Sequence, residues 1–321
     1  MISIIIPAHN AQAIIAECVT AVLQQRGVPQ PYEVIVVDDG SDDETAQRAT
    51  AAGATVIQQP PRGPAAARNN GLRAAQGDII CFTDADCVPQ PDWLAALVAP
   101  LLADEGTTAV KGRYITQQKE LTARFVQLEY EDKYDRLLNY DAISFMDSYS
   151  AACRRQALLD NNGFDEQFTT ASVEDRELSY RLASRGYKMV FQPRAVVAHT
   201  HAHTLPAYGR KKFFNGYWNA RVVRQFPERL IEDTYTPHSQ KLQIALMGVI
   251  VASTAVSLLL PFVWLLTFLL TVIFLASTLP FLGKAWRRDK AVMFIAPFML
   301  GLRALALGFG YLCGLLQIDL G

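Results

Sequence analysis

Pairs of acidic residues follow two apolar runs of the sequence. Asp38 and Asp39 end the run Tyr32–Val37, and Asp84 and Asp86 follow a second such run. Alternate residues of a strand point to one side, so Asp84 and Asp86 can share a hard divalent cation. That ion could bridge to a diphosphate and stabilise it as a leaving group. Aspartate is also common in turns, and the equivalent placement of the two pairs is what favours a metal site.

Two other features could serve the same chemistry. Glu174 and Asp175 begin a predicted helix, whose positive N-terminal dipole keeps carboxylates ionised and therefore basic. The alternative is an ordinary acidic first turn. Arg68 could offer its guanidinium to a base or a phosphate.

Three histidines alternate near the end of the polar half of the chain. His199, His201 and His203 lie on a predicted strand over residues 196–203 and would share one face of it. The alternative is a row of surface imidazoles without a ligand.

The elements that must position these residues alternate between strand and helix. The β-branched run Ile2–Ile6 ends at Pro7, and strand patterns recur at Tyr32–Val37, Ala54–Ile57 and Asp78–Thr83 with helical patterns between them. This order predicts an α/β fold with an open, mostly parallel sheet and flanking helices. A ligand crevice is expected at the carboxyl edge of the sheet.

Composition excludes several classes of protein. The net charge is −1 and half of the residues are hydrophobic, which excludes a disordered chain. Acids outnumber bases over residues 1–202, so no nucleic-acid partner is expected. The five cysteines form no CxxC pair, which favours reduced thiols over a zinc knuckle or a disulfide framework. The first residues carry no basic region and do not resemble a signal peptide.

The last third of the chain has the pattern of a membrane region. Residues 242–283 contain no charged residue, and Leu242–Leu282 would form a helix about twice as long as the ~30 Å bilayer core, so a hairpin turning at Pro261 is expected. Three spans are predicted, at about 242–260, 262–282 and 291–316. The basic loop between the last two belongs inside, which would place the first domain in the cytoplasm and the C-terminus outside the cytoplasmic membrane.

Two regions next to these spans carry notable charge. Residues 205–241 interleave basic and aromatic side chains, as in an amphipathic helix on an anionic lipid surface; the alternative is a solvated charged face. Arg303 is the only charge in the third span and stands near its middle. The hairpin offers it no acid, so carbonyls, water or the anionic head of a lipid acceptor are the expected counter-groups.

Five motifs in order make the chain resemble a family 2 glycosyltransferase with the GT-A fold: Ile4 to Asn10, Val37 to Ser41, Ala67 to Gly71, Phe82 to Asp86, and Glu174 with Asp175. The resemblance covers residues 1 to about 200 and implies a catalytic domain over 1–204. It implies inverting transfer of a sugar from a nucleoside diphosphate donor, with Asp175 as general base beside Glu174. A base opposite the leaving group is what inversion by single displacement requires.

The resemblance also implies roles for individual residues. Mg²⁺ or Mn²⁺ would be held by Asp84, Asp86 and His199, with His201 as second choice. Arg154 is expected near the acceptor or a phosphate. The donor would contact Pro7, Ala8, Asn10, Asp38, Asp39, Arg68, Asp84 and Lys111.

These features favour a membrane-anchored enzyme that glycosylates a hydroxyl of a lipid or lipid-linked acceptor at the cytoplasmic face. One alternative is a polyprenyl-phosphate glycosyltransferase, whose anionic acceptor needs no base. Another is an inactive nucleotide-sugar-binding membrane scaffold, which would be expected to lack one of the acidic sites. No QxxRW motif follows Glu174 and Asp175, so the chain departs from processive polysaccharide synthases.

Overall fold

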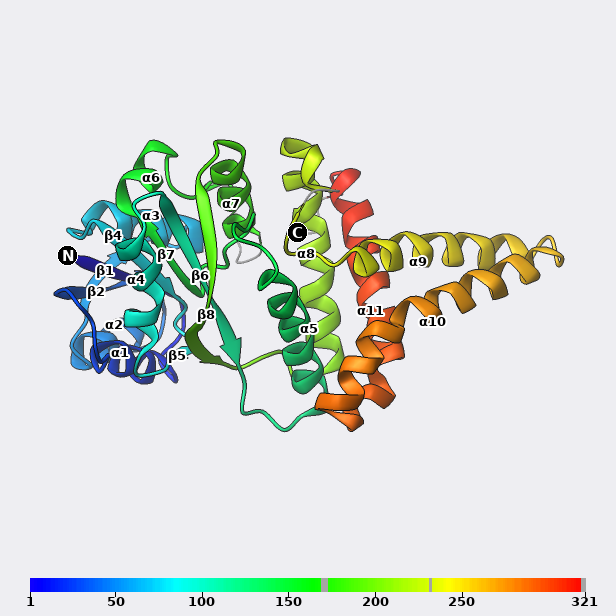
Figure 1. The fold of residues 1–321 in the computed structure, drawn as a ribbon, viewed down its shortest axis with the longest axis horizontal. Helices are drawn as coiled ribbons and strands as arrows, with labels where there is room; N and C mark the ends of the chain where they lie inside the picture. The colour runs from blue at the N-terminus through cyan, green and yellow to red at the C-terminus, as the bar shows by residue number, and fades with distance from the viewer. Residues whose placement is uncertain (169–172, 231–232, 319–321) are drawn as a thin grey trace. The chain divides into compact units, whose positions relative to one another are not determined.

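The computed structural model describes residues 1–168, 173–230 and 233–318, which form two compact units. Unit 1 comprises Met1–Gln117, Leu137–Thr200 and the short segment Asp233–Tyr235. Unit 2 comprises the rest of the described chain, namely Gln118–Arg136, the residues from His201, and those from Thr236 onward. Figure 1 shows the course of the chain.

Unit 1 is built on one mixed eight-stranded sheet. Its strand order is β3-β2-β1-β4-β7-β6-β8-β5. The first four are parallel, whereas β7 is antiparallel to β4 and β6, and β5 is antiparallel to β8. The mostly parallel open sheet predicted from the sequence is confirmed. In chain order the strands are β1 (Ile2–Ala8), β2 (Tyr32–Asp39), β3 (Thr55–Gln59), β4 (Ile79–Thr83), β5 (Cys87–Pro89), β6 (Thr107–Ile115), β7 (Ser150–Arg154) and β8 (Lys188–His199).

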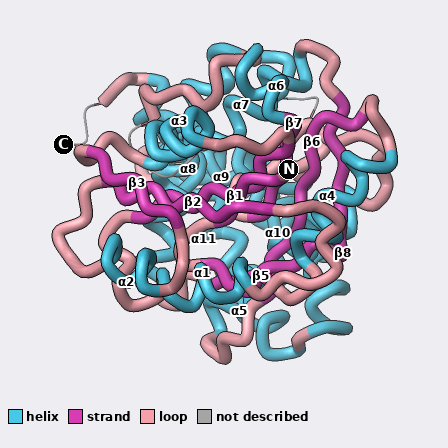
Figure 2. The backbone as a smooth tube through the Cα atoms, turned by 90° about the vertical axis from the view of Figure 1, so that its left-hand side faces the viewer, coloured by secondary structure: helices cyan, strands magenta, loops and turns pink. Residues whose placement is uncertain are grey.

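Helices cover both faces of this sheet. Figure 2 shows α3 on one side of β1 and β2 and α1 and α2 on the other. The apolar side of α1 is fully buried, and Gly71 brings α3 so close to β1 that an added Cβ would lie 2.5 Å from the Ile5 side chain. The helices of unit 1 are α1 (Ile15–Leu23), α2 (Thr45–Ala51), α3 (Pro64–Ala74), α4 (Trp93–Ala103), α6 (Arg155–Asp160) and α7 (Glu174–Ser184).

The last strand corrects one expectation. β8 ends at His199, so His201 and His203 lie outside any strand and the three histidines do not share a strand face. His201 belongs to unit 2, where its ring stacks on Tyr130 and its Nε2 lies 3.0 Å from Gln127 Oε1. The contacts of His201 with Gln127 and Tyr130 therefore lie within unit 2.

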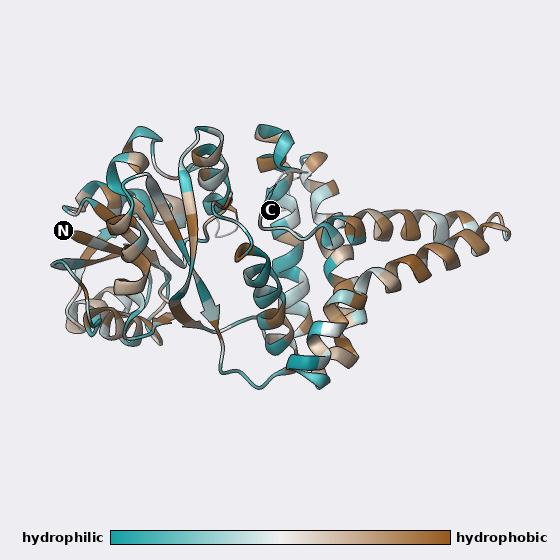
Figure 3. Cartoon of the chain, in the orientation of Figure 1, coloured by the Kyte–Doolittle hydropathy of each residue, from teal (hydrophilic) through white to brown (hydrophobic). Residues whose placement is uncertain are grey.

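Unit 2 is helical, and three of its helices are long and apolar enough to cross a membrane. They are α9 (His238–Ser257), α10 (Val263–Arg288) and α11 (Lys290–Leu315), and the hairpin between α9 and α10 turns at Pro261 as expected. Figure 3 shows the apolar character of α9 and α10 along most of their length. The other elements are α5 (Leu121–Leu137), α8 (Leu205–Gln225) and the 3₁₀ helix η1 (Pro227–Leu230).

A buried ionic cluster ties the helices of unit 2 together. Arg303 donates to Glu129 Oε1 of α5 at 2.9 Å and to Gln243 Oε1 of α9 at 2.6 Å. Lys212 of α8 lies 3.0 Å from Glu129 Oε2. Burial opposes ionisation of Glu129, but Lys212 and Arg303 lower its pKa to about 2. The expected counter-groups of Arg303 were therefore wrong, because the acid comes from α5, far from the spans in sequence.

Candidate active site

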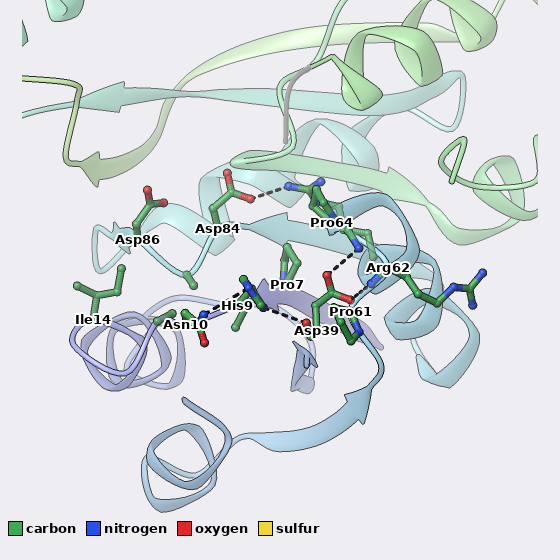
Figure 4. A pocket seen from close by; sticks show the side chains of 15 residues that line it. Pro7, His9, Asn10, Ile14, Asp39, Pro61, Arg62, Pro64, Asp84 and Asp86 are labelled. Atoms are coloured by element: carbon green, nitrogen blue, oxygen red, sulfur yellow. Dashed lines mark hydrogen bonds and ion pairs between the residues drawn. The ribbon is translucent and has the colours of Figure 1, made fainter. Parts of the chain in front are cut away.

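A cleft of about 690 Å³ opens at the carboxyl ends of β1, β2 and β4. Figure 4 shows Asp84 and Asp86 on one side of it and His9, Asn10 and Asp39 on another. The crevice therefore lies at the edge of the sheet where parallel strands are expected to bind ligands. The predicted donor and metal residues that line it are Pro7, Ala8, Asn10, Asp39, Arg68, Asp84 and Asp86.

The turn after β1 is fixed by hydrogen bonds to the loop that follows β2. Asn10 has a φ of 49°, a left-handed conformation that asparagine tolerates. Its backbone N–H donates to Ser41 Oγ at 2.9 Å, and its side-chain oxygen accepts from the Asp42 N–H at 3.0 Å. His9, which the sequence interpretation did not single out, places Nδ1 3.0 Å from the Asp39 carbonyl oxygen.

Asp38 and Asp39 are both buried but do different things. Asp39 lines the cleft and accepts from the backbone N–H groups of Arg62 and Gly63, at 2.8 and 2.7 Å. Asp38 accepts from Ser41 Oγ at 2.5 Å and does not line the cleft. The two acids thus fix the loops that form the walls.

The DxD segment, Asp84 to Asp86, places its second acid, Asp86, beside His199. His199 Nδ1 lies 3.4 Å from Asp86 Oδ2, and the Asp86, Cys87 and His199 ligand atoms all lie within 4.8 Å of one another. Burial and the neighbouring acids Asp86 and Glu174 raise the pKa of Asp84, and Arg68 opposes the shift. Carboxylate oxygens that repel one another beside an imidazole nitrogen fit Mg²⁺ or Mn²⁺. Burial raises the pKa of the Cys87 thiol, which makes thiolate coordination unfavourable.

Arg68 links the DxD segment to α7. One guanidinium nitrogen donates to Asp84 Oδ1 at 2.7 Å and another to Glu174 Oε1 at 2.8 Å. The side chain is 3% exposed and packs against the ring of Phe164. Arg68 is therefore committed to two carboxylates from elements far apart in sequence, rather than left open for a phosphate.

Asp175 lies on the first turn of α7, beyond Glu174. Its Oδ2 accepts from the backbone N–H of Ser148 at 3.2 Å. Burial and the adjacent Glu174 raise its pKa to about 7, against the opposing effects of Arg68 and the Ser148 hydrogen bond. The expectation that the helix dipole alone keeps this acid ionised is thus corrected, because desolvation outweighs it.

Lys111 and Arg154 do not line this cleft. Lys111 is fully buried, forms an ion pair with Asp147, and donates to Tyr149 Oη at 3.4 Å. Burial lowers its pKa well below the usual range, and Asp175 opposes the shift. Arg154 pairs with Ile79 at the start of β4 and donates to the carbonyl oxygens of Leu101, Asp104 and Thr107. It therefore lies at the opposite edge of the sheet from Asp84, where it anchors a loop.

The sequence interpretation missed several residues that contact the predicted site residues Lys111, Asp175 and His199. Asp147 pairs with Lys111, and Ser148 donates to Asp175. Tyr114 stacks on Tyr149 with ring centroids 3.3 Å apart and on His199 with centroids 4.4 Å apart. None of them lies in a recognisable motif, since their contacts join segments that are distant in sequence.

Comparison with known proteins identifies relatives of this chain. Residues 3–160 match the model of the family described as Glycosyl transferase family 2. The pre-mycofactocin glycosyltransferase of Mycobacterium tuberculosis is 32% identical over 175 residues, covering 52% of this chain and 36% of that protein. The glycosyltransferase AglE of Haloferax volcanii is 26% identical over 214 residues, covering 62% of this chain and 66% of that protein. The chain thus spans between about a third and two thirds of these relatives.

The fold also has solved counterparts. The mannosyltransferase PcManGT from Pyrobaculum calidifontis, in complex with GDP-Man and Mn²⁺, has a TM-score of 0.63 at 20% identity. The match covers 99% of this chain and 88% of that one. At this identity the likeness establishes the fold alone.

Proposed function

We propose that the chain is a family 2 glycosyltransferase, because residues 3–160 match the model of that family, and that it transfers a sugar from a nucleoside diphosphate donor with inversion. The observation that carries the proposal is the Arg68 bridge. It joins Asp84 of the cleft to Glu174, the neighbour of Asp175. A metal-binding acid and a base-bearing helix are thereby fixed relative to one another, as a displacement between two bound substrates requires.

The donor is assigned to the cleft. The Pro7–Asn10 turn and the Asp39 wall would hold the nucleotide, and Asp84, Asp86 and His199 would hold Mg²⁺ or Mn²⁺. A divalent ion there neutralises the developing charge on the diphosphate. PcManGT was solved with GDP-Man and Mn²⁺, which supports a donor and an ion of this class.

Asp175 is the proposed general base. A pKa of about 7 leaves a substantial fraction of the carboxyl ionised near neutral pH while keeping it a strong proton acceptor. The Ser148 hydrogen bond orients one carboxylate oxygen and leaves the other for an acceptor hydroxyl.

The acceptor is proposed to be a hydroxyl of a lipid or lipid-linked molecule at a membrane. Three helices able to cross a bilayer support membrane anchoring, and Lys284, Arg287 and Arg288 at the end of α10 favour the cytoplasmic side for that end. If the basic end of α10 is cytoplasmic, the start of α9 and the catalytic unit before it are cytoplasmic too. The third crossing, α11, would then place the residues after it on the far side of the inner membrane. Basic and aromatic residues of α8 fit the interface between headgroups and water.

A donor and acceptor panel tests this function. The purified full chain in detergent is given each nucleotide sugar with native lipid extract, and nucleoside diphosphate release is measured. Release that depends on extract and on a divalent ion is expected. If none of the donors gives nucleoside diphosphate release, the proposal is contradicted. That result would favour the inactive nucleotide-sugar-binding scaffold.

A polyprenyl-phosphate acceptor is the alternative within the enzymes. That acceptor is already anionic, so transfer to it needs no base. Asp175→Asn distinguishes the two: full transfer by this variant would favour the phosphate acceptor.

A further inference from the structure

Three residues between two helices of unit 2 belong to unit 1. The segment Asp233–Tyr235 lies between η1 and α9 in sequence but clusters with the sheet. Asp233 is 8% exposed and Tyr235 is 3% exposed. Nothing in the sequence pattern singled this segment out, and the proposed reaction has not used it.

The segment docks on the loop that precedes β7. The Ser144 N–H donates to Thr234 Oγ1 at 2.9 Å, and the Thr234 N–H donates back to Ser144 Oγ at 3.1 Å. Tyr235 packs edge-on against Phe145 with ring centroids 4.4 Å apart, and its hydroxyl donates to Asp147 Oδ1 at 3.4 Å. A reciprocal pair of hydrogen bonds and a ring contact fix both position and direction.

The loop over residues 143–149 reaches the proposed reaction centre at several points. Its Ser148 N–H holds Asp175, and its Asp147 pairs with the buried Lys111. Tyr149 continues the stack through Tyr114 to His199. Movement of this loop would therefore shift the proposed base and one proposed metal ligand together.

Tyr235 also completes the surroundings of the Lys111 ammonium group. The Lys111 Nζ lies 5.3 Å from the ring centroid of Tyr235, 5.4 Å from that of Phe145 and 5.1 Å from that of Tyr149. A buried ion pair tolerates little displacement, because its attraction repays the cost of desolvation only in good geometry. Aromatic faces that attract the cation add to that restraint.

We propose that Thr234 and Tyr235 are positioning residues of the transfer site: they hold loop 143–149 in place and, through Ser148 and the Lys111–Asp147 pair, orient Asp175 toward the acceptor. The inference rests on the proposed function, since it takes Asp175 as the base. It adds that the transfer site is completed by a segment that the chain supplies between α8 and α9.

The charged groups that face Asp175 make its proton affinity a sensitive readout. They are Glu174, Arg68 and Arg176 on α3 and α7, and Lys111 on β6. Arg176 itself packs over the rings of Phe145 and Tyr235. Loosening the loop changes the distances of Lys111 and Arg176 from the carboxyl, and so the pH at which it loses its proton.

The test uses the full chain in detergent with Tyr235→Phe, which keeps the ring and removes the hydroxyl, and Thr234→Val, which removes one partner of the reciprocal pair. Tyr32→Phe is the matched control, because the Tyr32 hydroxyl donates to the carbonyl oxygens of Val22 and Leu23 in α1. We expect Tyr235→Phe to lower kcat about tenfold with donor KM unchanged, since it loses a hydrogen bond to the Asp147 carboxylate. Thr234→Val loses a neutral hydrogen bond to Ser144, so it should lower kcat by a smaller factor, again with donor KM unchanged. The acid limb of the pH profile should move in both, and Thr234→Ser should retain wild-type kinetics.

Unchanged kcat and pH profile in a folded Tyr235→Phe, while wild type releases nucleoside diphosphate, would overturn this inference alone. A parallel loss of thermal stability and of both kinetic constants, without a pH shift, would also overturn it in favour of a structural role. Failure of the proposed function is distinguishable, because wild type itself would then release no nucleoside diphosphate.

Discussion

Arg68 in unit 1 and Arg303 in unit 2 are both buried and both bound to carboxylates, yet their surroundings differ in charge. Arg68 contacts Asp84 and Glu174, with Asp86 and Asp175 nearby, so acids outnumber the guanidinium. Arg303 contacts a single acid, Glu129, which also binds Lys212.

The difference bears on the metal site proposed beside Arg68. Around Arg68 the surplus is negative and borders a cleft, and a surplus of buried negative charge is stabilised by binding a cation. Around Arg303 the charges and hydrogen bonds are shared among α5, α8, α9 and α11. Both clusters carry an excess of one sign, negative around Arg68 and positive around Arg303 and Lys212, so the cleft beside Arg68 is what supports the proposed metal site there.

Removing the cation or its ligand should have the largest effect. Asp86→Ala, or excess EDTA on wild type, is expected to lower transfer by roughly 10³-fold, because a metal ion contributes several kcal/mol to stabilising the leaving group. Nucleoside diphosphate release with and without added Mg²⁺ or Mn²⁺ measures it. Full turnover in EDTA would remove the distinction drawn between the two arginine clusters.

Asp175→Asn should separate chemistry from binding. A general base contributes roughly 10²- to 10⁴-fold to the rate and little to the ground state, so transfer should fall while donor affinity changes little. Calorimetric titration of donor into the variant provides the measurement. A large loss of affinity would show that Asp175 is a donor ligand instead.

The Arg303 cluster should respond through stability rather than kinetics. Arg303→Gln removes the closest partner of Glu129, but Lys212 still pairs with that carboxylate, so the cost should stay below the roughly 3–5 kcal/mol of leaving a buried charge unpaired. The variant should unfold at a lower temperature, while the folded fraction keeps its acceptor KM. Glu129→Gln should cost more than Arg303→Gln, because it leaves both Arg303 and Lys212 without their carboxylate partner. A raised acceptor KM with unchanged stability would instead support the lipid-head role first expected for Arg303.

The sequence predicted what depends on local pattern and failed where distant segments meet. Strand ends placed Asp39, Asp84 and Asp86 at one edge correctly, because parallel strands expose their carboxyl ends together. The partner of Arg303 could not be found, since Glu129 lies in a polar helix with no membrane signal of its own.

Two other differences have the same origin. The histidine strand was predicted too long, because alternation continues past His199 where pairing with β5 and β6 has ended. Arg154 is the last residue of β7, whose antiparallel direction carries it to the opposite edge. Strand direction in a mixed sheet is set by tertiary pairing, which a single sequence pattern does not encode.

Per pH unit, the smallest expected effect is that of Asp175 titration. Its pKa is raised to about 7, so the folded protein binds this proton between about pH 4 and 7, whereas the unfolded chain releases it near the usual aspartate pKa of 3.8. Stability contributed by this group is therefore greatest at low pH and declines as pH rises through that window. Activity runs the other way, because the base must be ionised: kcat/KM should rise about tenfold per pH unit below 7 and level off above it.

Thermal unfolding of wild type and Asp175→Asn between pH 4 and 8, together with the pH–rate profile, checks both signs. Wild type should lose stability relative to the variant as pH rises. No comparable pH dependence between pH 4 and 8 is expected from Glu129, whose pKa of about 2 keeps it ionised throughout. If Asp175→Asn keeps the acid limb of the pH–rate profile, the titrating group is not Asp175. The Arg68 and Arg303 clusters would then not differ in the pH dependence that this prediction assigns to Asp175.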